Sequence, residues 1–288
     1  MTKVRILRRG DEGSLEEFLL PQIESSMFLL GNLRAAGLTD RGQSLEGTYA
    51  AAFEAGKIVA VVAHYWNGNL VFQAPDHVAA LARTVVEASG RAIQGLLGPQ
   101  RQVDVAKMTL SLDAARIMLD ETEYLYSLTL MDLIVPEALR SGQLRGRRIE
   151  RGDLDLLAKW RVGFSLEALG EEPSDRLWER CRASAERSLD RGPTWILEEG
   201  GKPVATSSFN ATTAEAVQIG GVWTPPELRS RGFGRAVVAA SLLDARAQGV
   251  MKSILFTGVS NVPAQRAYSG LGFRHIGDYR LLLLRPPS

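Results

Sequence analysis

Residues 221–235, GVWTPPELRSRGFGR, join a predicted strand to a predicted helix and decide the fold of this chain. Gly232 and Gly234 let the backbone approach an anion closely, and the free N–H groups at the start of a helix point toward such an anion. Three arginines of the same stretch add positive charge. Hydrogen bonds to charged groups are worth ~1.5–3 kcal/mol each, so this turn predicts a phosphate or pyrophosphate site. A tight turn with solvated arginines is the alternative.

Two well-known phosphate-binding patterns do not match this turn. A dinucleotide-binding Rossmann motif needs a third glycine and an acidic residue at ribose-binding distance, and both are missing here. No Gly-Lys-Ser/Thr follows, so the turn is not a P-loop. The sequence on either side of the turn therefore has to indicate the ligand.

The turn and its surroundings resemble the GNAT superfamily of acetyltransferases. Arg229, Gly232 and Gly234 occupy the fixed positions of that superfamily's coenzyme A pyrophosphate loop, Q/R-x-x-G-x-G/A. Residues 261–273, NVPAQRAYSGLGF, are similar to its N-x-x-A-x-x-x-Y…GF element, and residues 221–227 look like the strand that pairs with pantetheine. The resemblance covers roughly residues 145–288. It implies an acetyl-CoA-dependent N-acetyltransferase that uses no metal.

The resemblance implies a role for each matching residue. The strand backbone is expected to pair with pantetheine and to polarise the thioester carbonyl, the amides of residues 230–235 to bind the pyrophosphate, and Arg266 or a loop arginine to bind the nucleotide's phosphate. Because Pro225 and Pro226 cannot donate to a ladder, the strand should diverge there from residues 254–256 and open the cofactor slot. The implied cofactor-binding residues are Val222, Trp223, Thr224, Arg229, Ser230, Arg231, Gly232, Phe233, Gly234, Arg235, Asn261, Ala264 and Arg266.

Tyr268 is implied as the catalytic residue, the proton donor to the leaving thiolate. Proton transfer from a phenol of pKa ~10 to a thiolate of pKa ~8.5 is uphill by ~2 kcal/mol. We therefore expect Tyr268 to assist in the transition state, by ~10²–10⁴-fold at most, rather than to protonate a finished thiolate. The alternative is that Tyr268 and Ala264, which share a helix face, are helix core.

The general base is not evident in the sequence. Where GNAT enzymes often carry a glutamate, this chain has Gln218, which cannot accept a proton but can orient a water. Glu198 and Glu215 are candidate bases, with solvated strand-end charges as the alternative. Neutralising a lysine-like amine at pH 7 costs ~4–5 kcal/mol, and an α-amine only ~1.4 kcal/mol. A reaction without a strong base is therefore more plausible if the acceptor is a weakly basic amine or if a water relays the proton.

The acceptor is left open, as a small-molecule amine or a peptide or protein amine. Residues 170–175, GEEPSD, join the first two helices of this half and carry three carboxylates, which either attract a cationic amine or form a solvated loop. Ser207, Ser208 and Asn210 offer further polar contacts. The acyl chain and a homodimer are also left open. A non-catalytic acyl-CoA-binding sensor or interaction protein on the same fold is the alternative to an enzyme.

Composition excludes several other classes of protein. The 288 residues suit two domains, and an apolar fraction of 45% with a charged fraction of 23% is ordinary for a globular protein. A net charge of +1 indicates no nucleic-acid or anionic-membrane partner. Cys181 is the only cysteine, and the three histidines show no metal-ligand spacing. No membrane span or signal peptide is apparent, so we expect a cytoplasmic protein.

An internal echo indicates duplication. Residues 53–60, FEAGKIVA, and residues 198–205, EEGGKPVA, both predict a hairpin with a glycine at the turn, and each is followed by a run that ends in proline. We therefore expect two tandem GNAT-like domains, 1–140 and 141–288, joined by a polar, glycine-bearing connector at 141–146. The first copy lacks the glycine loop and the Asn-to-Tyr element. It is expected to be degenerate, to bind no cofactor, and to wall the acceptor pocket.

The expected fold class is α/β with a mixed sheet. The second half should read strand, two helices, three strands, helix, strand, helix and two closing strands. The helix after the cofactor loop is expected over 233–248, because its apolar residues recur at helical spacing and Gly249 ends it. The closing strands are expected around 273–275 and 279–284.

Overall fold

The computed structural model describes residues 2–168 and 170–285. The chain divides into two compact units. Unit 1 comprises Met1–Leu125 with Ile276–Ser288, and unit 2 comprises Tyr126–His275. These units differ from the expected division at residue 140: residues 126–140 of the expected first domain belong to unit 2, and residues 276–285 of the expected second domain belong to unit 1.

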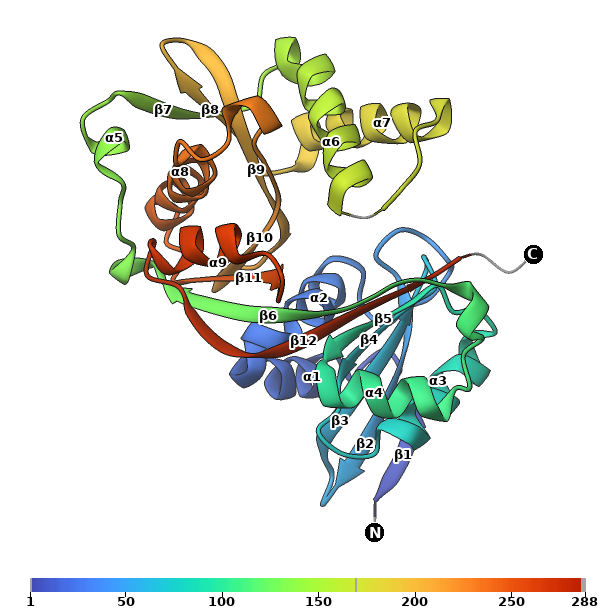
Figure 1. Ribbon diagram of the computed structural model, residues 1–288. Helices are drawn as coiled ribbons and strands as arrows, with labels where there is room; N and C mark the ends of the chain where they lie inside the picture. The colour runs from blue at the N-terminus through green and yellow to red at the C-terminus, as the bar shows by residue number, and fades with distance from the viewer. Residues whose placement is uncertain (1, 169, 286–288) are drawn as a thin grey trace. The chain divides into compact units, whose positions relative to one another are not determined.

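One order of elements occurs twice along the chain: strand, two helices, three strands, helix, strand, helix, strand (Figure 1). The first copy consists of β1 (Lys3–Ile6), α1 (Glu12–Leu19), α2 (Ile23–Ala36), β2 (Gly47–Glu54), β3 (Lys57–Tyr65), β4 (Asn69–Gln73), α3 (Val78–Ser89), β5 (Gly95–Pro99), α4 (Gln100–Thr109) and β6 (Ile117–Thr129). After the short α5 (Glu137–Arg140), the second copy consists of β7 (Leu144–Arg148), α6 (Leu154–Ala168), α7 (Asp175–Arg191), β8 (Thr194–Glu199), β9 (Lys202–Thr212), β10 (Ala216–Trp223), α8 (Phe233–Ala247), β11 (Lys252–Gly258), α9 (Val262–Ser269) and β12 (Arg274–Leu284). The tandem α/β architecture is thereby confirmed.

The last strand of each copy completes the sheet of the other unit. In unit 1 the strand order is β1-β2-β3-β4-β5-β12, with Tyr279 of β12 opposite Pro99 of β5 in an antiparallel pair. Figure 1 shows the red β12 beside β5. In unit 2 the order is β6-β11-β10-β9-β8-β7, so β11 has β6 as its outer neighbour. The two closing strands expected near 273–275 and 279–284 are one continuous strand, a prediction that was wrong.

Both expected hairpins are present. The turn between β2 and β3 has φ of 48° at Ala55 and 80° at Gly56. The turn between β8 and β9 has φ of 56° at Gly200 and 76° at Gly201. Two successive positive φ values define the type I′ turn, whose twist matches that of the flanking strands. The echo in the sequence is therefore an echo in backbone geometry.

Helices cover both faces of the unit 2 sheet. On one face, Phe233 and Val237 of α8 pack with Trp195 and Leu197 of β8. On the other face, Leu157 and Trp160 of α6 pack with Ile196 and Trp223. Burying each such side chain contributes about 1.5–3 kcal/mol, so the two clusters hold β10 between α6 and α8.

A short capped turn leads into the first long helix of unit 2. Glu150 takes the cap position of a short 3-10 turn, Arg151–Asp153, that leads into α6. Arg147 donates to both carboxylate oxygens of the buried Asp153, at 2.6 and 2.9 Å, and this ion pair fixes the turn. Within residues 2–168 and 170–285, no helix combines the length and apolarity needed to cross a bilayer.

Candidate functional site

The edge of β10 loses its parallel partner halfway along. Ala216, Val217 and Gln218 pair with Lys252, Ser253 and Ile254 of β11, and the pairing of described residues ends there. The register with β9 shifts between Gly220 and Trp223, where Gly221 has φ of 58°. This bulge turns the strand before the two prolines, so the pairing ends earlier than the prolines indicate. The backbone of residues 219–223 is left without a strand on the β11 side.

The turn after β10 presents a row of backbone donors. Gly232 caps α8 with φ of 82°, and Ser230 has φ of 63°. The first amide to enter the helix ladder is that of Ala236, which donates to the Gly232 carbonyl at 3.0 Å. Among the described residues, the N–H groups from Ser230 to Arg235 have no hydrogen-bond acceptor. Nothing lies within 4 Å of the position that a Gly232 Cβ would take.

Two of the three loop arginines are held by carboxylates. Arg229 forms a two-point ion pair with Glu167 of α6, at 2.9 and 2.8 Å, and its guanidinium stacks 4.9 Å from the Trp223 ring centroid. It also donates to the Thr224 carbonyl at 3.0 Å. Arg231 donates to both oxygens of Glu199, at 2.9 and 2.8 Å. These two arginines hold the loop against α6 and β8.

Arg235 is the loop arginine that has no ion-pair partner in the described part of the chain. One of its terminal nitrogens lies 3.3 Å from the position that a Gly270 Cβ would take, at the end of α9. Arg266 is exposed on α9 and forms no ion pair with a described residue either. Among the described arginines of the loop and α9, Arg235 and Arg266 are therefore the two without an ion-pair partner.

The helix that carries Tyr268 is fixed at both ends. Asn261 caps α9, and its side-chain oxygen accepts from the Ala264 N–H at 3.2 Å. At the other end, the Tyr268 carbonyl accepts from Leu271 and Phe273, at 2.9 and 3.2 Å. The Asn261 oxygen is thus engaged in capping. Tyr268 itself is buried, with 8% of its surface exposed.

Tyr126 is a neighbour of Tyr268 that the sequence did not indicate. Its ring centroid lies 6.5 Å from that of Tyr268, and Phe273 flanks Tyr268 at 6.0 Å. Tyr126 belongs to β6, in the first copy of the repeat, and is 6% exposed. Tilted and edge-to-face aromatic pairs are worth about 0.5–1.5 kcal/mol beyond burial, so these two rings fix the orientation of Tyr268. Tyr126 comes close to Tyr268 because the last strand of the first copy completes the unit 2 sheet, and the sequence did not indicate this pairing.

The candidate bases lie apart from the cofactor loop or are engaged. Glu198 accepts from Arg147 at 2.7 Å. The hydrogen bonds of Arg147 to Asp153 and Glu198 raise the pKa of its guanidinium, although burial opposes the shift. Glu215 immediately precedes β10, at the end opposite the loop, and its carbonyl accepts from Met251 and Lys252 at 3.3 and 3.1 Å. Gln218 lies on β10 itself, 1% exposed.

Polar groups of β9 lie over the bulge. The Asn210 side chain covers Gly220 so closely that a Cβ there would be 2.1 Å from its amide nitrogen, and only glycine leaves that room. Ser208 lies beside Gly221 and shares a hydrogen bond with the Thr194 hydroxyl at 2.9 Å. Ser207 is fully buried, and its hydroxyl has no partner among the described residues.

The expected acidic connector is partly used within unit 2. Glu171 pairs with Arg180 of α7, and the Ser174 hydroxyl caps α7 by accepting from the Leu177 N–H at 3.2 Å. Arg161 of α6 donates to Ser184 and Ser188 of α7, at 2.8 and 2.7 Å. Burial lowers the pKa of the Arg161 guanidinium. No group of three or more metal-ligating side chains is found in the described ranges.

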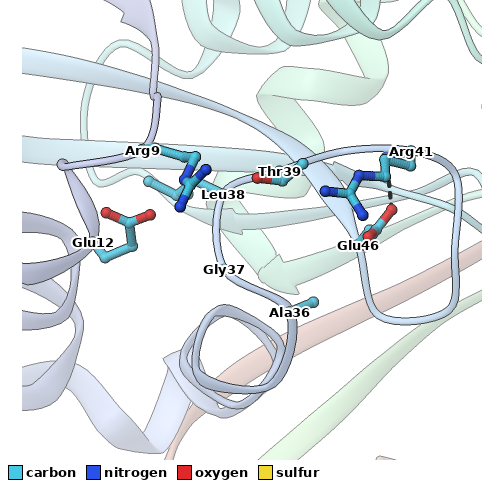
Figure 2. A pocket seen from close by; sticks show the side chains of 8 residues that line it. All are labelled: Arg9, Glu12, Ala36, Gly37, Leu38, Thr39, Arg41 and Glu46. Atoms are coloured by element: carbon cyan, nitrogen blue, oxygen red, sulfur yellow. Dashed lines mark hydrogen bonds between the residues drawn. The ribbon is translucent and has the colours of Figure 1, made fainter.

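A cavity of about 360 Å³ in unit 1 is lined by side chains of both charges (Figure 2). Two arginines, Arg9 and Arg41, and two glutamates, Glu12 and Glu46, line it. Each glutamate accepts a backbone N–H at 2.6 Å, Glu12 from Gly10 and Glu46 from Arg41. With equal numbers of each charge, the lining favours neither an anion nor a cation, and we assign it no function.

Comparisons with known proteins agree with this geometry. The family model described as "Acetyltransferase (GNAT) family" matches residues 155–273. A search of curated proteins found no match. Among solved structures, a Drosophila protein shares 16% identity with a TM-score of 0.68, and 99% of each chain is covered.

Two further structures extend the likeness over the whole chain. A GCN5-related N-acetyltransferase from Sphaerobacter thermophilus shares 16% identity, TM-score 0.58, covering 100% of this chain and 97% of that one. A tandem GNAT protein from the clavulanic acid biosynthesis pathway shares 11% identity, TM-score 0.56, with 100% of each chain covered. At these identities the structures show the fold alone. The family likeness itself rests on residues 155–273, which match the acetyltransferase (GNAT) family model.

Proposed function

We propose that the second half of the chain transfers an acetyl group from acetyl-CoA to the primary amine of an acceptor, by direct attack on the thioester. The observation that carries this proposal is the row of N–H groups from Ser230 to Arg235, which have no acceptor among the described residues and open α8 beside the unpaired edge of β10. Such a row at a helix N-terminus suits a pyrophosphate. The family whose model the chain matches uses acetyl-CoA as co-substrate.

The residues around the loop fit that ligand. The φ of 82° at Gly232 and the open space around it bring the backbone, rather than a side chain, to the anion. Arg235 and Arg266 are placed to bind the nucleotide's phosphate, since both are exposed and form no ion pair with a described residue. Val222, Trp223 and Thr224 lie on the unpaired edge, where an extended pantetheine arm would add as a strand does.

Tyr268 is the proposed proton donor to sulfur. Its helix is fixed by the Asn261 cap and its ring by Tyr126 and Phe273, so the phenol has a defined direction. A phenol contributes by sharing its proton as charge develops on sulfur, because full transfer is uphill. A backbone N–H of β10 on the same edge would stabilise the developing oxyanion.

Unit 1 is proposed to bind no cofactor. After β4, the Ala74 N–H is taken by the Gln102 side-chain oxygen at 2.7 Å, so the end of that strand already has its partner. The residue before α3 is His77, which lies 3.1 Å from Glu54, and a buried Val78 follows it. The cap residue of α3 thus carries a side chain where the cap residue of α8 is a glycine, and this difference supports the proposal.

The rival proposal is a non-catalytic acyl-CoA-binding sensor or interaction protein. Both readings require the same loop, and the fixed Tyr268 favours the enzyme. A screen of amines with acetyl-CoA and colorimetric detection of free thiol separates them. We expect thiol release in proportion to acetylated product for at least one class of primary amine. Coenzyme binding without thiol release across small amines, peptides and protein N-termini would favour the sensor.

A further inference from the structure

Gln218 carries a buried polar atom whose purpose the fold does not explain. Its side-chain oxygen is inaccessible and has no hydrogen-bond partner among the described residues. Leaving such an atom unsatisfied is costly, because it loses its hydrogen bonds to water and gains none within the fold. Gln218 lies opposite Ala211 of β9 and is the last β10 residue to pair with β11, two positions before Gly220. It therefore stands where β10 begins its unpaired edge.

A carboxamide at this position has limited chemistry. Its oxygen accepts a hydrogen bond but cannot take a proton at neutral pH. A neutral amine offers an N–H donor and keeps its lone pair for attack, whereas an ammonium ion must first lose a proton to a base. The identity of the partner of Gln218 thus depends on whether a base stands nearby.

The carboxylates on the elements that pack against β10 are all engaged. The elements that pack most extensively against β10 are β9, β11, α6 and α8. Their carboxylates are Asp155, Glu167 and Asp244, which pair with Arg182, Arg229 and Arg148 respectively. Their basic side chains are Lys159, Arg161, Lys202, Arg235, Arg246 and Lys252. No carboxylate of these four elements that the structure describes is free to accept a proton near Gln218.

We infer that Gln218 acts through one water, which donates to its side-chain oxygen and accepts the N–H of the acceptor amine, and that the acceptor is a weakly basic amine bound in its neutral form. This inference rests on the proposed acetyl transfer and names its substrate class. α-Amines and aromatic amines belong to the class, and lysine-like alkylamines do not.

The reaction balances without a protein base. The amine lone pair attacks the thioester carbonyl carbon, the N–C bond forms, and the C–S bond breaks with its electron pair going to sulfur. One proton passes from nitrogen to sulfur overall. Tyr268 gives its proton to sulfur, and the proton lost by nitrogen restores the phenol. The products are the amide and the free thiol.

A measurement at several pH values separates amines of this class from alkylamines, because the two kinds of amine differ in the fraction that is neutral. At pH 7 an α-amine of pKa ~8 is about one-tenth neutral, and an alkylamine of pKa ~10.4 less than about one-thousandth. Without a base, kcat/KM should rise about tenfold per pH unit up to the pKa of the acceptor and then level. At pH 7 an α-amino amide should therefore exceed a propylamine probe by roughly a hundredfold or more.

The experiment measures thiol release with these two probes from pH 6 to 9, in the intact chain and three variants. Gln218→Leu should lower kcat/KM for the α-amino amide at least tenfold and leave the acetyl-CoA Kd unchanged. Gln218→Glu should add a base, flatten the pH profile and narrow the gap between the probes. The matched control is Ser253→Ala. Ser253 lies on β11 opposite Val217, and its buried hydroxyl, like the Gln218 oxygen, has no described partner. Because neighbouring strand residues alternate faces, this control should leave both profiles unchanged.

Two results would overturn the inference. One is a preference of the intact chain for propylamine with a flat profile below pH 8. The other is unchanged kinetics in Gln218→Leu, provided that circular dichroism shows the variant folded. Absence of thiol release with every amine tested, by contrast, would refute the proposed acetyl transfer and not the role of Gln218 alone.

Discussion

Replacing Gly232 by aspartate, with a matched control, should distinguish the effect of backbone strain from the effect of added negative charge on acetyl-CoA binding. Gly232 has φ of 82°, and nothing lies within 4 Å of a Cβ built on it. Any L-residue there pays the left-handed backbone cost of about 1–2 kcal/mol, with no steric clash to add. Gly249, beyond the far end of α8, has φ of 88° and equally open space. Gly249→Asp is therefore a control with the same backbone strain and the same added charge, remote from the loop.

The two variants should differ in ligand binding and not in stability. About 1–2 kcal/mol lowers the melting temperature by roughly 2–8 °C in a domain of this size, in both variants. A carboxylate about 4 Å from a phosphate charge is repelled by about 1 kcal/mol in water and about 4 kcal/mol at an effective dielectric constant of 20. Gly232→Asp should thus raise the acetyl-CoA Kd by at least fivefold and up to about a thousandfold.

Equilibrium dialysis with acetyl-CoA, at fixed ionic strength, measures this difference directly. We expect Gly249→Asp to bind as the unaltered chain does. Gly232→Ala should fall between the two, because it carries strain without charge. Equal Kd values in Gly232→Asp and Gly249→Asp would refute the assignment of the pyrophosphate to this loop.

Four further predictions follow from other parts of the structure. Tyr268→Phe should lower kcat about 10²-fold or more while leaving the acetyl-CoA Kd nearly unchanged; an equal loss of affinity would make Tyr268 structural. Tyr126→Leu should lower kcat more modestly, again at constant Kd, because it loosens the orientation of Tyr268; unaltered turnover would contradict that role. A fragment of residues 141–288 should fail to fold, as judged by circular dichroism, because it lacks the buried side chains of Tyr126, Leu128 and Leu130. Their burial contributes roughly 5–9 kcal/mol, against a typical domain stability of about 5–15 kcal/mol. His64 is buried, and desolvation lowers its pKa from 6.5 to about 4. The unfolded chain therefore binds the proton more readily, and stability should fall as pH drops from 6.5 toward 4. In thermal melts His64→Gln should weaken that fall, and an identical pH dependence in both proteins would contradict the role of His64.

Local patterns in the sequence were sufficient for the hairpins, the helix after the loop and the strand before it. Gly56 and the Gly200–Gly201 pair set the two turns, and the apolar spacing after Gly232 set α8, which ends at Ala247 where 248 was expected. These features depend on a few adjacent residues, so a single sequence carries them.

The exchange of β6 and β12 was not accessible in the same way. Which strand lies beside β11 depends on the free energy of two alternative long-range pairings, and neither leaves a local signature. The expected boundary near residue 140 followed the connector, whereas Tyr126–Arg140 belongs to unit 2 and Ile276–Leu284 to unit 1. Tyr126 escaped notice for this reason.

Long-range ion pairs were hidden for a related reason. Arg229 and Glu167 are far apart in sequence, and the motif alone assigns the arginine to the cofactor. Its two-point contact with α6 shows that it also positions the loop. The engagement of Glu198 by Arg147 likewise depends on the pairing of β7 with β8, in which Arg145 lies opposite Glu198.

The stoichiometry of acetyl-CoA binding to the intact chain tests the central claim most directly. Isothermal titration calorimetry should give one site per chain, and that site should be lost or severely weakened in Gly232→Asp. Two sites would show that unit 1 also binds the cofactor. No site, or one site that Gly232→Asp leaves intact, would contradict a cofactor site at the turn between β10 and α8.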